Sequence, residues 1–125
     1  MKDARRIYEL MVLAAWADGR VQPEEALAVH QLVAADPAFA RLGNKAEISR
    51  DIQSRIAEKG LEAALREAAA AIAQGDREFA FHCCARVVSA DGEMAGEDAE
   101  VLGTLQEVFG LSGDAVKRLI VDRNR

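Results

Sequence analysis

Apolar residues recur at intervals of three and four positions along almost the whole chain, which is the period of one face of an α-helix. Runs that alternate apolar and polar residues, as half-buried strands do, are absent. The pattern predicts helices over residues 3–17, 23–36, 44–60, 61–73, 76–90, 97–109 and 112–122. We therefore expect an all-α, single-domain bundle of about seven helices over residues 1–125.

Residues with strong preferences for helix ends stand at these boundaries. Gly19 can take the left-handed conformation that ends many helices, and Pro23 suits the first turn of the next helix. Asn44, Asp76 and Ser112 are expected to cap the helices that they precede, because their side chains accept bonds from free amides. The helix boundaries are therefore encoded locally.

The expected core consists of the apolar positions on these helix faces. In the first helix they are Ile7, Leu10, Met11 and Ala14, and in the second Leu27, Val29, Leu32 and Val33. Phe39 and Leu42 are expected to anchor the short turn that follows. Trp16 and Cys83 are also expected in the core, whereas Cys84 is expected to be half-buried and His30 to lie at the surface.

One ten-residue phrase occurs twice, as WADGRVQPEE from Trp16 to Glu25 and as SADGEMAGED from Ser89 to Asp98. The copies lie 73 positions apart. This shift aligns Asp18 with Asp91, Gly19 with Gly92, Val21 with Met94, Glu24 with Glu97 and Glu25 with Asp98. The first two helices and the fifth and sixth are therefore expected to be copies of one helical hairpin, related by internal pseudo-symmetry.

Most of this phrase is explained by helix ends alone. Glycine stops one helix, Val21 or Met94 packs inward, and the acids complement the positive start of the next helix. Asp18 and Asp91 do not fit, since each follows the negative end of its own helix, where an exposed carboxylate costs about 0.3–1 kcal/mol. These two aspartates need a further explanation.

Two explanations are open for the aspartates. They could cap the following helices, because Gln22 and Ala95 at the usual capping positions are poor caps. Alternatively, the turns could bind a divalent cation such as Ca²⁺, Mg²⁺, Mn²⁺ or Zn²⁺. The candidate metal ligands are Asp18, Glu24 and Glu25 in the first copy and Asp91, Glu93, Glu97 and Asp98 in the second. The loop lacks the ligand spacing of an EF-hand, and spacing alone favours capping.

The second copy is the stronger candidate for cation binding. Arg20 in the first copy would repel a cation, whereas Glu93 takes its place in the second. The two turns could form one joint site only if the pseudo-twofold axis runs along the helices, because both turns then lie at the same end.

The charge distribution indicates which kinds of molecule the protein could bind. The formal net charge is −5, and residues 87–116 contain seven acids and no lysine or arginine. Such a surface suits cations or a basic protein and disfavours nucleic acid. No apolar run approaches the roughly 20 residues of a membrane span.

The two cysteines and the two histidines give no catalytic pattern. Cys83 and Cys84 are adjacent and have no third partner, which is typical of a reducing compartment and favours the cytoplasm. His82, Cys83 and Cys84 point in different directions on a helix and cannot share one ligand site. No catalytic triad, phosphate-binding loop or zinc spacing is present, so we do not expect an enzyme.

The doubled phrase, at 17–25 and 90–98 of an all-helical chain, resembles the TerB-like tellurite-resistance family over nearly its whole length. A related domain precedes the J-domain of a membrane-attached co-chaperone. The resemblance implies a bacterial, cytoplasmic stress-response protein and metal binding through the motif acids Asp18, Glu24, Glu25, Asp91, Glu97 and Asp98. The alternative is a metal-independent adaptor whose acidic face docks a basic protein or a membrane-associated stress complex.

Overall fold

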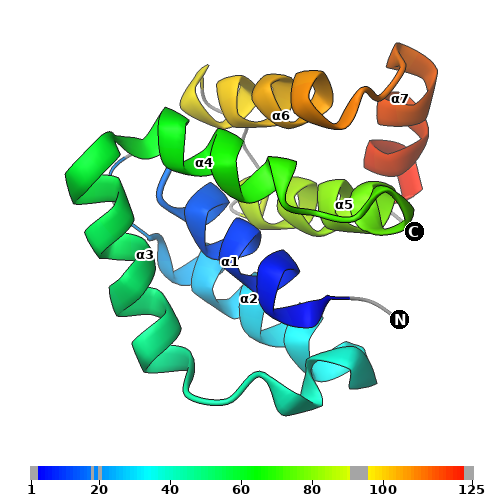
Figure 1. The fold of residues 1–125 in the computed structure, drawn as a ribbon. Helices are drawn as coiled ribbons and strands as arrows, with labels where there is room; N and C mark the ends of the chain where they lie inside the picture. Colours follow the sequence, from blue (N-terminus) through cyan, green and yellow to red (C-terminus); the bar gives the residue numbers. More distant parts are fainter. Residues whose placement is uncertain (1–2, 18, 20, 91–95, 123–125) are drawn as a thin grey trace.

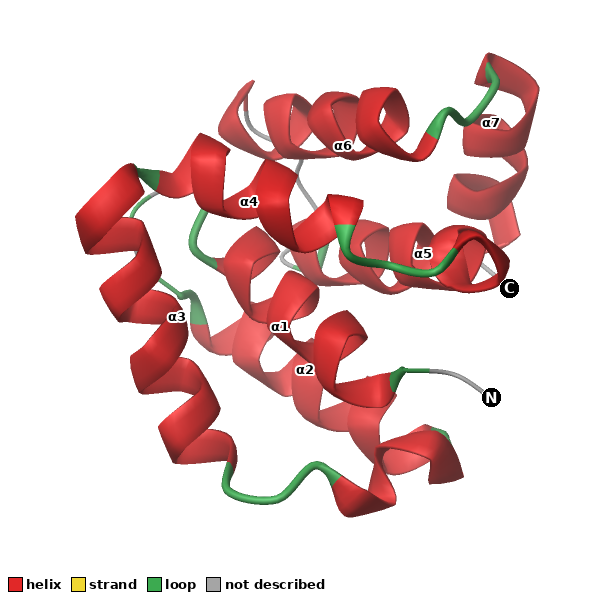
Figure 2. Cartoon of the chain, viewed as in Figure 1, coloured by secondary structure: helices red, strands yellow, loops and turns green. Residues whose placement is uncertain are grey.

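The computed structural model describes residues 3–17, 19, 21–90 and 96–122, and this part of the chain contains helices, turns and no strand (Figures 1 and 2). The α-helices are α1 (Ala4–Ala15), α2 (Pro23–Ala35), α3 (Lys45–Lys59), α4 (Leu61–Ala70), α5 (Arg77–Val88), α6 (Gly96–Phe109) and α7 (Gly113–Asp122). Two short 3₁₀ helices are η1 (Pro37–Arg41) and η2 (Gln74–Asp76). The all-α fold with seven α-helices is thus confirmed.

Helix α1 lies at the centre of the bundle and packs against α2, α3, α4 and α5. Every residue from Ile7 to Ala15 is buried, because helices cover α1 on all sides. Helix α5 packs against α1, α2, α6 and α7. These two helices therefore supply the middle of the core, and the others form a shell around them (Figure 1).

Two of the three expected caps are confirmed. Asn44 Oδ1 accepts a hydrogen bond from the Glu47 amide at 3.2 Å, and Ser112 Oγ accepts one from the Ala115 amide at 3.1 Å. Gly19 also has the left-handed backbone expected of it, with φ of 89°.

The expected cap at Asp76 is wrong. Asp76 follows a 3₁₀ turn with φ of −102° and ψ of −5°, so it lacks the extended backbone that directs a capping side chain onto its own helix. Its Oδ2 instead accepts a hydrogen bond from the Asp3 amide at 3.2 Å.

Several side chains and helix ends differ from the sequence-based expectation, and Val29, Leu32 and Val33 of α2, expected in the core, are only partly buried. Cys84 is 0% exposed rather than half-buried, because the part of α5 on which it lies is covered by neighbouring helices. Leu27 is 54% exposed, because it lies outside the face of α2 that packs on the core. Trp16 is only partly buried, and α4 ends at Ala70 rather than at residue 73.

The pseudo-twofold axis runs along α1 and α5. Asp3 and Asp76, which are bonded to each other at the starts of these helices, are 73 positions apart, the same shift that aligns the repeated phrases. At the opposite ends, Ala17 lies with Glu97 at the start of α6, and Ala90 lies with Glu24 at the start of α2. The starts of α2 and α6 therefore lie at the same end of the bundle as the ends of α1 and α5 (Figure 1).

No helix in the described ranges is long and apolar enough to cross a membrane.

Candidate functional site

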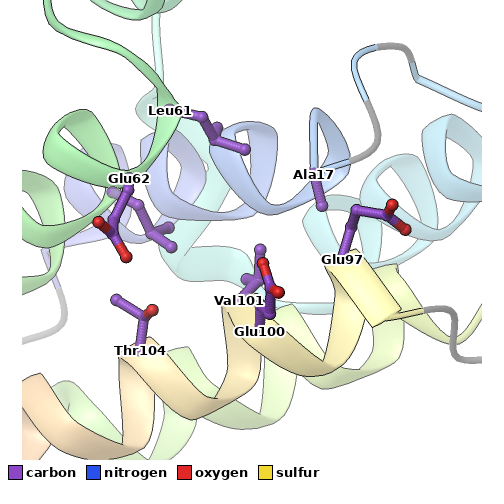
Figure 3. A pocket seen from close by; sticks show the side chains of 8 residues that line it. Ala17, Leu61, Glu62, Glu97, Glu100, Val101 and Thr104 are labelled. Carbon is purple, nitrogen blue, oxygen red and sulfur yellow. The ribbon is translucent and has the colours of Figure 1, made fainter.

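A small pocket lies where the end of α1 meets the start of α6, and we call it the α1–α6 pocket. Its volume is about 70 Å³, and α4 borders it on one side (Figure 3). The lining residues are Ala17, then Leu61, Glu62 and Leu65 of α4, and Glu97, Glu100, Val101 and Thr104 of α6. Glu97 thus lies beside the residue that precedes Asp18 of the other motif copy.

A larger depression of about 280 Å³, the α2–α5 groove, lies where the end of α5 meets the start of α2. It is lined by Glu24, Leu27, Ala28 and Gln31 of α2 and by Arg86, Ser89 and Ala90 at the end of α5. Glu24 here lies beside the residue that precedes Asp91 of the other copy.

These two depressions are equivalent under the internal pseudo-symmetry. A shift of 73 positions converts five residues of one lining into five of the other. The pairs are Ala17 with Ala90, Glu24 with Glu97, Leu27 with Glu100, Ala28 with Val101 and Gln31 with Thr104. Each copy of the motif therefore places its exposed acid against the turn of the other copy, an exchange that the sequence did not predict.

The expected metal ligands fall into three groups. Asp18, Asp91 and Glu93 lie outside the described residues. Glu24 and Glu97 are exposed at the first turns of α2 and α6. The third group consists of the buried acids Glu25 and Asp98.

Glu25 and Asp98 occupy equivalent positions and are 4% and 7% exposed. Glu25 Oε1 accepts a hydrogen bond from the Gln22 amide at 2.8 Å, so this carboxylate caps α2. A buried carboxylate is costly unless it is hydrogen-bonded, and the free amides of a helix start supply such bonds. Glu25 therefore caps the start of α2 at the Gln22 backbone amide, a role that was considered for Asp18.

Within the described ranges, no three His, Cys, Asp or Glu side chains are grouped so that they could hold a metal ion. Cation binding by the motif acids stays a prediction that depends on Asp18, Asp91 and Glu93 together with Glu24 and Glu97.

The two cysteines are buried in the core, and His82 contacts the backbone of α7. Burial raises the pKa of the Cys84 thiol well above its ordinary value, and the neighbouring Cys83 adds to this, so the reactive thiolate is disfavoured. His82 Nδ1 lies 3.3 Å from the carbonyl oxygen of Leu119 and links α5 to α7.

A cluster of charged side chains around the buried Glu9 was not anticipated from the sequence. Glu9 is 5% exposed, and its Oε2 lies 3.3 Å from Arg5 Nε and 3.4 Å from Arg55 of α3. Burial lowers the pKa of Arg55, but the bonds and charges of Asp51 and Glu9 outweigh this and leave it raised. The signal available in the sequence was one acid inside the apolar stretch of the first helix. The cluster ties α1 to α3, and its charges pair with one another.

The chain matches the family model described as tellurite resistance protein TerB over residues 4–121. This range extends from the first residue of α1 into α7, so the match involves the whole helical body and both motif copies. Searches of curated proteins and of solved structures gave no match.

Proposed function

Because the chain belongs to the TerB family of tellurite resistance proteins, we propose that it is a non-enzymatic stress-response protein of the cytoplasm whose acidic turns bind one divalent cation. A single observation carries this proposal. Ala17 lies with Glu97, and Ala90 lies with Glu24, so the two motif copies come together at one end of the bundle.

Hard cations need several oxygen ligands, and one helical turn rarely supplies enough of them. Glu24 and Glu97 each stand at the positive start of a helix, which weakens their individual attraction for a cation. A site that combines them with Asp18 and Asp91 would overcome this weakness. We assign the direct contacts to these exposed or turn residues, with Glu93 adding negative charge, and the support of the turns to the buried Glu25 and Asp98.

Calorimetric titration of chelator-treated protein with Ca²⁺, Mg²⁺, Mn²⁺ and Zn²⁺ tests this function. We expect saturable heat for at least one cation and a loss of affinity of about tenfold or more in Asp91→Asn, because a ligand charge is removed. Asp114→Asn is the matched control, since Asp114 belongs to the same base-free acidic window but lies at the exposed start of α7. The partly buried Trp16, two residues before Asp18, offers a fluorescence readout.

Two results would contradict cation binding by the turns. One is the absence of saturable heat with all four cations. The other is an equal loss of affinity in Asp91→Asn and Asp114→Asn, which would indicate a general effect of net charge.

A second candidate function, the metal-independent adaptor, is favoured by a separate observation. Leu27 is the large hydrophobic side chain that stands exposed in the described part of the chain, and it lines the open α2–α5 groove. An exposed aliphatic side chain in an open depression offers a partner apolar area to bury.

A further inference from the structure

The two equivalent depressions differ in whether a third helix packs against them. Leu61 and Leu65 of α4 pack over the α1–α6 pocket, and α4 contacts both α1 and α6. In the described part of the chain, the lining of the α2–α5 groove comes from α2 and the end of α5 alone. The protein therefore contains one such depression with a helix on it and one without.

The side chains at equivalent positions reflect this difference. Leu13 of α1 is 0% exposed, whereas Arg86, its counterpart on α5 under the shift of 73, is exposed. Conversely, the polar Glu100 of the covered pocket is replaced in the open groove by Leu27. The open groove thus presents an aliphatic side chain between a base and an acid.

The charges in the groove are available to a partner. Neither Arg86 nor Glu24 forms an ion pair with another described residue, although both line the same groove. Among the described arginines, Arg5, Arg6, Arg55, Arg66 and Arg118 are each paired with an acid, whereas the exposed Arg41 and Arg50 resemble Arg86 in having no such pair. A ligand with one acid and one base at matching positions would satisfy both groups.

From this comparison we propose that the α2–α5 groove docks an amphipathic helix of a partner protein, seated as α4 is seated on the equivalent pocket. The helix carries leucines four residues apart with alanines between them, because such residues share one face and allow close approach. An acidic residue of this helix pairs with Arg86, and a basic residue pairs with Glu24. This inference extends the adaptor function and does not depend on cation binding.

The segment that covers the equivalent pocket is itself a suitable probe. A peptide with the sequence of residues 61–72, LEAALREAAAAI, holds Leu61 and Leu65 four residues apart and contains both acids and a base. A side-chain staple on the face opposite the leucines keeps this short peptide helical, since isolated helices of this length are marginal in water. A scrambled stapled peptide is its control.

The experiment is a titration of the ¹⁵N-labelled full chain with this peptide in the presence of a chelator, followed by amide chemical shifts. We expect saturable shifts at residues 24–31 and 86–90. Leu27→Ala, which removes the aliphatic side chain from the groove, is expected to weaken binding about tenfold, and Arg86→Glu to weaken it several-fold. Arg50→Glu, a charge reversal at an exposed arginine of α3, is the matched control and should bind as the wild type does.

The proposal is overturned if no saturable shift appears at these residues, or if Leu27→Ala binds the peptide as tightly as the wild type. Shifts confined to residues 97–104 would also overturn it, because the peptide would then compete with α4 at the covered pocket. The free protein could also self-associate, seen as concentration-dependent sedimentation, with shifts at the amides of residues 24–31 and 86–90. The occupant of the groove would then be a second copy of the chain, and the proposed partner helix would be wrong.

Leu27 is exposed, so Leu27→Ala should melt at the wild-type temperature, and this is checked by circular dichroism. Because the chelator removes metal ions, failure of peptide binding leaves the cation site untouched, and failure of cation binding leaves the groove untouched.

Discussion

At the scale of single residues, burial separates carboxylates that look alike in the sequence. Glu24 and Glu25 are neighbours, yet one is exposed and the other is buried and bonded to a backbone amide. Glu9 is buried among apolar residues and is held by two arginines. Residue type and spacing predicted acids at helix starts, but they could not predict which acids face solvent, because this depends on packing between distant helices.

Replacement of Glu9 tests the importance of the cluster of charged side chains around it. Glu9→Ala leaves Arg55 without one of its partners and removes a buried charge-assisted bond, so we expect a loss of about 1–3 kcal/mol in the free energy of unfolding. Urea denaturation measures this loss. Glu67→Gln, at the exposed partner of Lys59, is the control and should leave the midpoint almost unchanged. Equal effects of the two changes would contradict a special role for Glu9.

At the scale of helices, local signals predicted most boundaries correctly. Asn44 and Ser112 cap as expected because capping needs only residues three positions apart. Asp76 does not cap, because its carboxylate is taken by Asp3, which is distant in the sequence. The exposure of Leu27 was missed for a similar reason, since the periodic pattern does not reveal which apolar positions another helix covers.

The two neighbouring glutamates of α2 provide a test at this scale. Without metal ions, Glu25→Ala should lower the free energy of unfolding by about 0.5–2 kcal/mol. The reason is that the backbone amide of Gln22 loses its acceptor at the start of the helix. Glu24→Ala should leave stability almost unchanged and should instead weaken cation binding. Chemical denaturation in chelator, followed by calorimetry with metal, separates the two roles. If Glu24→Ala lowered stability and Glu25→Ala weakened cation binding, the capping and ligand roles would have been assigned to the wrong residues.

At the scale of the whole molecule, the axis along α1 and α5 determines what the repeat can do. Because the starts of α2 and α6 lie at one end, Glu97 stands beside Ala17 and Glu24 beside Ala90, so each acid lies next to the other motif copy. The repeated phrase was visible in the sequence, and so was the hairpin duplication that it implies. The direction of the axis was not, because sequence similarity relates two segments without fixing how they pack.

A shared site has a consequence for stoichiometry. We expect calorimetry to give close to one cation per chain, and Asp18→Asn and Asp91→Asn to weaken the same binding event. Their combined effect should be less than the sum of the single effects, since both remove ligands from one ion. Two cations per chain, with each substitution abolishing one of them, would indicate separate sites and contradict a joint site.

The contact between Asp3 and Asp76 has a consequence for how the two halves of the molecule can be built. Asp3 Oδ1 accepts a bond from the Arg6 amide of its own helix, while Asp76 Oδ2 reaches across to the Asp3 backbone. Two identical hairpins on a true twofold axis would have to give both aspartates the same partners. A single chain with only approximate symmetry is free of this restriction. Its two matched aspartates can therefore make different hydrogen bonds, one within its own helix and one to the other half of the molecule.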